Sequence, residues 1–398
     1  MLLIKVEFKG IVFQSEFILA LGLIAKIRGE RETVGIDVGH YSIKFVKVLH
    51  NSRGGKIVVD ADLERVPDGA IVNGEIQMRE GEAPADGSKV EKDGADLLSE
   101  SLSKLMLRHP MDDSCDVVVS VNCGAGAGGV LMDRLSVKVP KNGNEAAIIL
   151  QTAQSRPPFD DTDNVVDYEV VSRENEDVKV NVVAAKSGLL ESWSRFFIRR
   201  GLQPVAVDVD IFGLMNAFYV TAKEDDLQAT TAIFNIGEKK MSVAFMQDGK
   251  FHSMRAMTGG SLDMVIRKTC SNLNIDAEKC HEIFDKSDMS IVDGFSEAEV
   301  EAALKDSYED IMAQIDFGIR YFSSSEDSKT LNKILIAGGG ASIPGLKEYI
   351  AERTGIETDT VNPFSLVACD AKVFGEGGIS LALSNIYAPA LGLAMRKF

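Results

Sequence analysis

Val34-Gly-Ile-Asp-Val-Gly-His-Tyr-Ser-Ile-Lys44 is the stretch that decides the fold. An apolar run enters it, Asp37 and Gly39 interrupt that run, and a second apolar run leaves it from Ile43 to Leu49. This pattern predicts a strand, a tight turn and a second strand. Because Asp-X-Gly between two strands is most often only a hairpin turn, the stretch indicates chemistry only with a second observation beside it.

The chemistry that the stretch favours is phosphate binding. Gly39 lets backbone N–H groups approach an anion closely. Ser42 can donate a hydrogen bond to a phosphate oxygen, and Lys44 can supply positive charge. Asp37 can orient a hydrated Mg²⁺, because this ion keeps several waters and takes few protein ligands.

A second copy of the pattern lies far downstream, at Thr231-Ala-Ile-Phe-Asn-Ile-Gly237. Here Asn235 and Gly237 end an apolar strand as Asp-X-Gly does in the first copy, and an alternating strand follows from Met241 to Met246. Both copies continue through a turn into a third strand, at Lys56–Asp62 and Phe251–Met257. Two matching units predict a duplicated fold, whose two loops would face each other across a cleft.

Composition limits the classes of function. The chain has 398 residues, a formal net charge of −17 and a pI of about 4.9. Such a charge disfavours broad nucleic-acid binding, which requires a basic face. The five cysteines have neither metal-site spacing nor the density of a secreted domain, so we expect a reduced, cytoplasmic setting. The adjacent Cys280-His281 pair is interpreted as structural.

Residues 1–33 form an N-terminal extension. Its apolar run, Phe17 to Ala25, is too short to span a bilayer, and no convincing cleavage site follows it. We expect a plain extension or a start codon placed too far upstream. An amphipathic helix resting on a membrane is the alternative.

The middle of the chain predicts a small α+β unit over residues 131–204. The glycine-rich stretch Gly124 to Gly129 before it lacks the Lys-Ser/Thr of a P-loop and is interpreted as a linker. Within the unit we expect helices packed on one sheet. Its predicted elements are strands at Leu135–Val139, Val165–Val171 and Val178–Ala185, a helix at Asn144–Gln154, and a last helix capped by Ser187 and closed by Gly201. Trp193 and Phe197 on that last helix are expected in the core.

Asp208-Val-Asp210 precedes a predicted helix, Ile211 to Val220. A carboxylate at a strand end beside a nucleotide cleft can position water for attack on a terminal phosphate. Capping of the helix by Asp210 is the alternative, and both roles can hold together.

Two glycine-rich turns add to the nucleotide interpretation. Thr258-Gly-Gly-Ser261 leads into a helix, and a turn at a helix N-terminus can approach a phosphate or ribose. Gly338-Gly-Gly-Ala-Ser342 follows the buried strand Leu331 to Ala337. Three consecutive glycines let a base and ribose lie against the backbone, although a flexible turn without a ligand has the same sequence. A long amphipathic helix is predicted between the two turns, from Ser296 to Phe322.

With these loops in place, the chain resembles the actin-like ATPase superfamily, and most closely its PilM family of type IV pilus assembly proteins. The resemblance extends from Val34 to the C-terminus. The stretches that carry it are Gly35–Val48, Ala153–Val171, Gly201–Asp210, Ala337–Leu346 and Tyr387–Arg396. It implies an α/β, duplicated actin-like (ribonuclease H-like) fold with an inserted α+β subdomain and a nucleotide cleft between the halves. The expected segments are 34–130 for the first half, 131–204 for the insertion, and 205–398 for the rest of the first half and the second half.

The resemblance implies ATP and Mg²⁺ in the cleft. The first phosphate loop would comprise Asp37, Gly39, Ser42 and Lys44, with Asp37 holding Mg²⁺ through water. The second would comprise Asn235, Ile236, Gly237 and Glu238. The ribose and phosphates would lie near Gly259 and Gly260, and the adenosine would be surrounded by Gly338, Gly339, Gly340 and Ser342. Asp210 occupies the position that usually contacts the catalytic water.

The resemblance also implies partners. The family binds the short cytoplasmic N-terminal tail of PilN, an inner-membrane pilus protein, in a groove beside the inserted subdomain. This docking would place the chain on the cytoplasmic side, peripheral to the inner membrane, without an anchor of its own. Other proteins of the pilus assembly platform are expected partners, and an assembly of identical chains is left open.

One departure from the family pattern concerns hydrolysis. The second loop usually carries Asp, whereas this chain has Asn235, whose amide has no charge to offer Mg²⁺. His40 and Tyr41 stand where small hydroxyl residues are common, so they are expected to crowd the terminal phosphate. We therefore expect nucleotide binding with slow or absent hydrolysis, since catalysis needs both positioning and charge neutralisation.

Two other functions fit the same superfamily. An FtsA-like cell-division tether would end in a linker and an amphipathic membrane helix, but this sequence ends at Phe398 directly after its last predicted helix. A small-molecule kinase would need a substrate pocket with a general base, and no sugar-kinase signature is recognisable.

Overall fold

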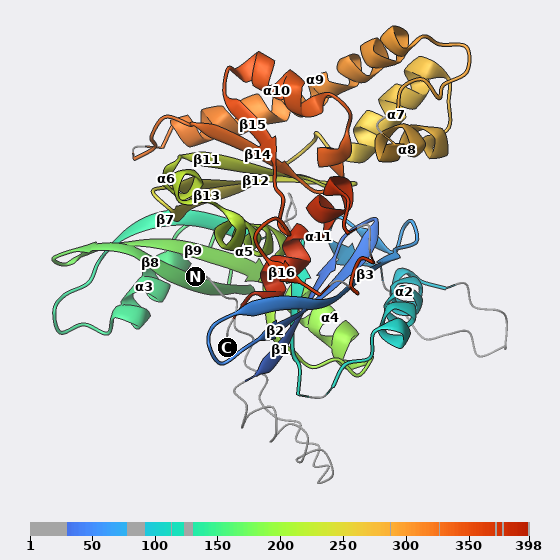
Figure 1. Ribbon diagram of the computed structural model, residues 1–398. Coiled ribbons are helices and arrows are strands. Elements are labelled where there is room, and N and C mark those ends of the chain that lie inside the picture. The colour runs from blue at the N-terminus through green and yellow to red at the C-terminus, as the bar shows by residue number, and fades with distance from the viewer. Residues whose placement is uncertain are drawn as a thin grey trace, which may run out of the picture. The chain divides into compact units, whose positions relative to one another are not determined.

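The computed structural model describes residues 30–77, 92–112, 114–122, 130–286, 288–325, 327–370, 372–375 and 378–396 (Figure 1). The predicted linker Gly124–Gly129 and nearly all of the predicted N-terminal extension lie outside these residues. The chain forms two compact units. The first contains the described residues up to Gly213 together with 368–370, 372–373 and 390–396, and the second contains those of 214–367 and 374–389.

The first unit is built on a six-stranded sheet in the order β10-β6-β1-β2-β3-β16. Its strands are β1 (Arg31–Val38), β2 (Ser42–His50), β3 (Lys56–Arg65), β6 (Asp116–Val121), β10 (Pro204–Val209) and β16 (Ala368–Cys369). β1, β2 and β3 form an antiparallel meander, whereas β6 runs parallel to both β1 and β10. Every residue of β6 is buried, as expected for a parallel strand covered on both faces.

The second unit repeats this topology in a five-stranded sheet with the order β13-β12-β11-β14-β15. Its strands are β11 (Thr231–Ile236), β12 (Met241–Gln247), β13 (Lys250–Met257), β14 (Lys333–Ala337) and β15 (Glu357–Thr360). Again the first three are antiparallel, and the fourth and fifth run parallel to the first. The shared strand order confirms the duplicated fold.

Helices of the second unit pack against one face of its sheet. They are α7 (Leu262–Leu273), α8 (Ala277–Lys286), α9 (Glu297–Ser323) and α10 (Leu346–Thr354); a short helix, α6 (Glu224–Gln228), precedes β11. Alternate residues of β11 and β12, including Phe234 and Phe245, enter a shared core with Ile311 and Ile315 of α9. α9 begins at a capping box between Ser296 and Glu299, which satisfies N–H groups that the first turn leaves free.

The insertion forms a three-stranded antiparallel sheet in the order β7-β9-β8, with α3 on one side (Figure 1). Its elements are β7 (Leu131–Lys138), α3 (Glu145–Gln154), β8 (Asn164–Glu174) and β9 (Asp177–Lys186). Ile149, Ala153 and Phe159 close its core against the sheet. This arrangement confirms the predicted α+β insertion, and Asn144, the first residue of the predicted helix, is its N-cap.

The last helix of the predicted insertion, α4 (Ser187–Ile198), departs from expectation in two ways. Ser187 is its first residue and not its N-cap, because the Ser187 N–H and hydroxyl both donate to Asp163, so the helix begins one residue early. α4 also contacts β10 of the first sheet, and is therefore not confined to the inserted sheet. Trp193 is buried as predicted, and its Nε1 donates to the Gly74 carbonyl at 3.1 Å.

Another helix of the first unit, α2 (Gly94–Arg108), lies against β2 and β3. A short hairpin of two-residue strands, β4 (Ile71–Val72) and β5 (Glu75–Ile76), precedes it. Asp93 caps the helix in a capping box with Asp96. None of the helices in the described ranges is both long and apolar enough to cross a membrane.

Two helices contain a boundary between the units: α5 (Asp210–Thr221) after Gly213, and α11 (Leu381–Ala394) after Pro389. The end of α11 lies directly on the first sheet. A Cβ at Gly35 would stand 2.0 Å from the Ala390 carbonyl oxygen, so only glycine permits this approach.

Charged side chains hold the C-terminal end of α11. Lys56 Nζ donates to the Met395 carbonyl at 3.1 Å, a favourable arrangement because a helix C-terminus carries partial negative charge. Arg396, just beyond the helix, forms an ion pair with Asp208 of β10, and each side chain is 1% exposed.

We expect the Arg396→Met variant to lose about 3–5 kcal/mol of unfolding free energy, because removing one partner of a buried pair leaves the other charge uncompensated. The measurement is urea denaturation followed by circular dichroism. Arg173→Met is the matched control, since Arg173 pairs with Glu145 at the surface and should cost no more than about 1 kcal/mol. Equal, small losses in both variants would contradict a structural role for the buried pair.

Candidate functional site

The first predicted phosphate loop joins β1 to β2. The Gly39 N–H donates to the Ser42 carbonyl at 3.0 Å and closes a four-residue turn. Beyond the turn, Asp37 lies opposite Lys44 in the strand register. Residues directly opposite each other in an antiparallel pair project to the same face of a sheet, so the turn brings these two charges together.

The Asp37 carboxylate is buried and held from two sides. Lys44 Nζ lies 2.9 Å from its Oδ2, and Ser120 Oγ of β6 donates to its Oδ1 at 2.7 Å. The Asp37 residue is only 4% exposed, so these partners replace water around the carboxylate. Ser120 was not anticipated from the sequence, because it is a single hydroxyl residue within a run of valines.

The tip of this loop carries an aromatic contact. The Arg65 guanidinium lies 3.6 Å from the centroid of the Tyr41 ring, and Arg65 is opposite Ser42 in the register of β2 and β3. Tyr41, which we expect to crowd a phosphate, therefore has its ring in contact with the Arg65 cation of the neighbouring strand β3. Gly39 leaves room for the lysine, since a Cβ at this position would lie 2.6 Å from Lys44 Nζ and would displace the ammonium.

A polar row continues across the sheet from this loop. Asp208 of β10 is opposite Ser120 in the parallel register, so it projects to the same face as Asp37. Burial raises the pKa of the Asp208 carboxyl, and the adjacent Arg396 opposes that shift. Asp210, the predicted water-positioning residue, is buried at the start of α5, and its Oδ1 accepts from the Ile211 N–H at 2.8 Å.

The second predicted loop has the same turn but a different charge. The Gly237 N–H donates to the Lys240 carbonyl at 2.9 Å, as Gly39 does to Ser42. Asn235 then lies opposite Ser242, at the positions that correspond to Asp37 and Lys44. The charged pair of the first loop is thus replaced by two neutral side chains in the second.

The start of α7 is bound to this second loop. The N–H groups of Leu262 and Asp263 donate to the carbonyls of Gly237 and Glu238, each at 2.9 Å. These two N–H groups of the first helical turn therefore already have protein acceptors. Gly260 has φ +75, and a Cβ there would lie 2.8 Å from the Met241 sulfur.

The triple-glycine loop packs on the second loop. Gly338 has φ +77, and a Cβ there would stand 2.6 Å from both the Asn235 Oδ1 and the Ile236 carbonyl oxygen. A Cβ at Gly340 would be 2.3 Å from Ile236 Cγ2. The following 3₁₀ turn, η1 (Gly339–Ser342), is closed by Ser342 Oγ donating to the Gly339 carbonyl at 2.6 Å.

The predicted site residues therefore form two groups, one in each unit. The first unit brings together Asp37, Gly39, Ser42 and Lys44, and adds Ser120. The second brings the 235–238 loop next to the glycines of the 259–260 and 338–342 turns. Within the described ranges, no three His, Cys, Asp or Glu side chains are gathered in a way that could hold a metal ion.

Comparison with known proteins places this geometry in context. The sequence model of the family described as type IV pilus assembly protein PilM matches residues 35–398. A solved PilM-PilN type IV pilus biogenesis complex contains a chain with the same fold, at 19% identity and a TM-score of 0.71, covering 91% of this chain and 97% of that one. The ethanolamine utilization protein EutJ of Carboxydothermus hydrogenoformans is more distant, at 14% identity and a TM-score of 0.48, covering 92% and 89%.

We expect Gly338→Ala to destabilise the second unit by about 1–3 kcal/mol more than Gly355→Ala, because Gly338 has φ +77 and ψ −172, a conformation nearly confined to glycine, and because a Cβ there would also clash with backbone. Gly355 is the matched control because it has φ +68 with nothing within 4 Å of a Cβ. Thermal unfolding of both variants measures the difference. Equal losses would contradict both the conformational requirement at Gly338 and its close approach to the second loop.

Proposed function

The chain belongs to the PilM family of type IV pilus assembly proteins, and from this premise we propose that it is a nucleotide-binding scaffold. In this proposal the scaffold binds ATP and docks the cytoplasmic tail of an inner-membrane, PilN-like protein. The family match favours this function over the tether and kinase alternatives. The observation that carries the nucleotide part is the Asp37, Lys44 and Ser120 arrangement beside the Gly39 turn.

The first loop fits a phosphate and a hydrated cation. Lys44 is held at the turn with its ammonium in the space that a Cβ of residue 39 would fill. A phosphate would compete with Asp37 for this ammonium, and the released carboxylate could accept hydrogen bonds from water around Mg²⁺. Ser120 keeps one oxygen of that carboxylate in place throughout.

The second loop supplies hydrogen bonds but no carboxylate. Asn235 and Ser242 can orient water or phosphate, yet neither neutralises the charge of a metal ion. We propose that ATP is bound and hydrolysed slowly or not at all. Gly237 and Glu238 would contact the phosphates, Gly259 and Gly260 the ribose side, and the 338–342 turn the adenosine. Asp210 keeps the role of orienting water.

The partner is proposed from the family and from the solved complex. In that complex a PilM protein is assembled with PilN. For this chain we propose the same class of partner, a short tail from an inner-membrane pilus protein, together with other proteins of the assembly platform. Such docking would place the chain at the cytoplasmic face of the inner membrane. Nucleotide can change this docking only if it has different affinities for two conformations of the scaffold.

The direct test is calorimetric titration of the full chain with a synthetic peptide of a PilN cytoplasmic tail, with and without ATP. We expect one peptide per chain, and an affinity that ATP changes by about fivefold or more, the usual lower range of allosteric coupling. A scrambled peptide of the same composition is the control. Equal affinity for the scrambled peptide would overturn the docking proposal. An affinity for the tail peptide that ATP does not change would show that nucleotide does not regulate docking.

Asn235→Asp tests the cause of slow hydrolysis. If the missing carboxylate limits turnover, the variant should release phosphate from ATP at least tenfold faster in the presence of Mg²⁺, the rate equivalent of about 1.4 kcal/mol of barrier. Asn175→Asp adds the same charge in the turn between β8 and β9 and should leave the rate unchanged. No gain at position 235 would mean that hydrolysis is limited elsewhere.

A further inference from the structure

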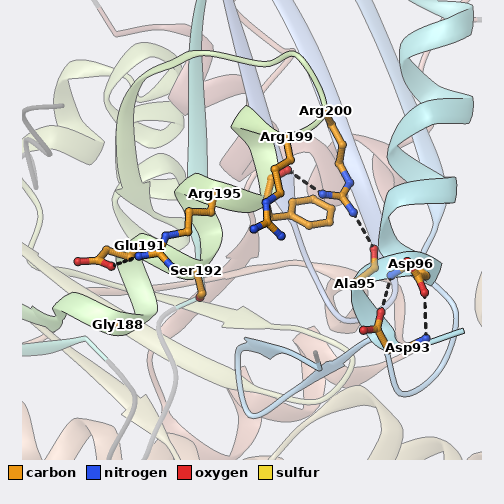
Figure 2. Close-up of a pocket in the computed structure, with 10 residues that line it drawn as sticks. Asp93, Ala95, Asp96, Gly188, Glu191, Ser192, Arg195, Arg199 and Arg200 are labelled. Atoms are coloured by element: carbon orange, nitrogen blue, oxygen red, sulfur yellow. Dashed lines mark hydrogen bonds and ion pairs between the residues drawn. The ribbon is translucent and has the colours of Figure 1, made fainter. Parts of the chain in front are cut away.

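The polar groups of the pocket between α2 and α4 largely bind one another (Figure 2). Arg195 pairs with Glu191 at 2.7 Å, and Asp93 and Asp96 form the capping box of α2. Arg200 donates to two backbone carbonyls. Acidic and basic side chains are equal in number in the lining, so this pocket favours neither an anion nor a cation.

The turn between β13 and α7 differs, because several of its polar groups lack partners. Gly260 is buried, yet its N–H donates to no acceptor among the described residues, and the same holds for the N–H of Gly259. Ser261 is the N-cap of α7, but its hydroxyl makes no capping bond. Since buried backbone N–H groups nearly always have partners in folded proteins, these groups indicate a place for a ligand or an ordered water.

The side chain of Gln314, on α9, extends along this turn. Its Cγ lies 3.0 Å from the position that a Cβ of Gly260 would occupy, and its Nε2 lies 3.5 Å from the corresponding position at Gly259. The two glycines therefore allow the side chain to pass. Its amide forms no hydrogen bond within the described part of the chain, and both polar atoms of the amide are accessible to solvent.

The surroundings of this amide are neutral and partly apolar. Residues 258–262 carry no charge, and Met264 Sδ lies 3.8 Å from the position of a Cβ on Gly259. The adjacent Asp263 is already bound by Lys239, at 2.8 Å. A phosphate prefers cationic donors, whereas a sugar hydroxyl pairs well with a neutral group that can both donate and accept. The position therefore suits the sugar of a nucleotide better than its phosphates.

We propose that Gln314 binds the two ribose hydroxyls of the nucleotide, so that binding depends on the sugar as well as on the phosphates. The amide oxygen accepts from one hydroxyl and the amide nitrogen donates to the other. A sugar without these hydroxyls leaves both amide atoms without partners in the complex. This inference rests on the proposed nucleotide function, in which Gly259 and Gly260 contact the ribose side, and it names the side chain that selects the sugar.

The test is calorimetric titration of the full chain, after removal of co-purified nucleotide, with ATP and with 2′,3′-dideoxy-ATP. We expect the native chain to bind ATP at least about tenfold more tightly than the dideoxy analogue, because two hydrogen bonds are lost with the hydroxyls. Gln314→Leu keeps the approximate size of the side chain but removes its polar atoms. This variant should bind ATP at least about fivefold more weakly than the native chain and should bind the two nucleotides within about threefold of each other.

Gln154→Leu is the matched control, since Gln154 is an exposed glutamine at the end of α3, in the first unit. It should leave both affinities unchanged, and thermal unfolding without nucleotide checks that each variant is folded. Binding of ATP and the dideoxy analogue with equal affinity by the native chain, a comparison that needs no variant, would overturn this inference alone. So would a native ratio of affinities in folded Gln314→Leu. No binding of ATP by the native chain would overturn the proposed function together with this inference.

Discussion

The close packing of the C-terminal helix on the first sheet is the constraint on which the first unit depends. Gly35 must lack a side chain for Ala390 to approach, and two residues further along the same strand Asp37 projects to the same face. On the edge strand β10 of the same sheet, Asp208 forms the buried ion pair with Arg396, just beyond α11. The residues that close the core and those proposed to hold phosphate therefore share one surface of one sheet.

Duplication of one unit explains most of the architecture, and the sequence difference between the two copies of the loop explains the proposed function. Both units have the same strand order and the same four-residue turn after the first strand. The turn, however, is followed by Lys44 in one copy and by Ser242 in the other, opposite Asp37 and Asn235 respectively. A single charged loop can bind a nucleotide, whereas fast hydrolysis would need charge neutralisation from both sides. We therefore propose that the chain holds a nucleotide and does not rapidly consume it.

Sequence patterns predicted those elements whose structure depends on residues close to one another in the chain. The two turns, the strands around them and the elements of the insertion all follow from periodicity and turn residues. Ser120, Gly35 and Arg396 were missed as contacts because their partners lie up to several hundred residues away, and one serine in a valine run carries no signal of its own. The prediction that Ser187 caps α4 was wrong for a related reason, since the Ser187 hydroxyl donates to Asp163, which lies in another segment.

The central claim is that the first loop binds the phosphates of ATP through Lys44. The most direct test is calorimetric titration with ATP, with and without Mg²⁺, of the native chain and of the variants Lys44→Met and Lys47→Met. Both lysines are on β2, but Lys47 pairs with Glu32 at 3.9 Å, away from the loop. Binding by the native chain and by Lys47→Met, with at least a tenfold loss in Lys44→Met, is the predicted result. Equal binding by both variants, or none by the native chain after removal of co-purified nucleotide, would contradict the account.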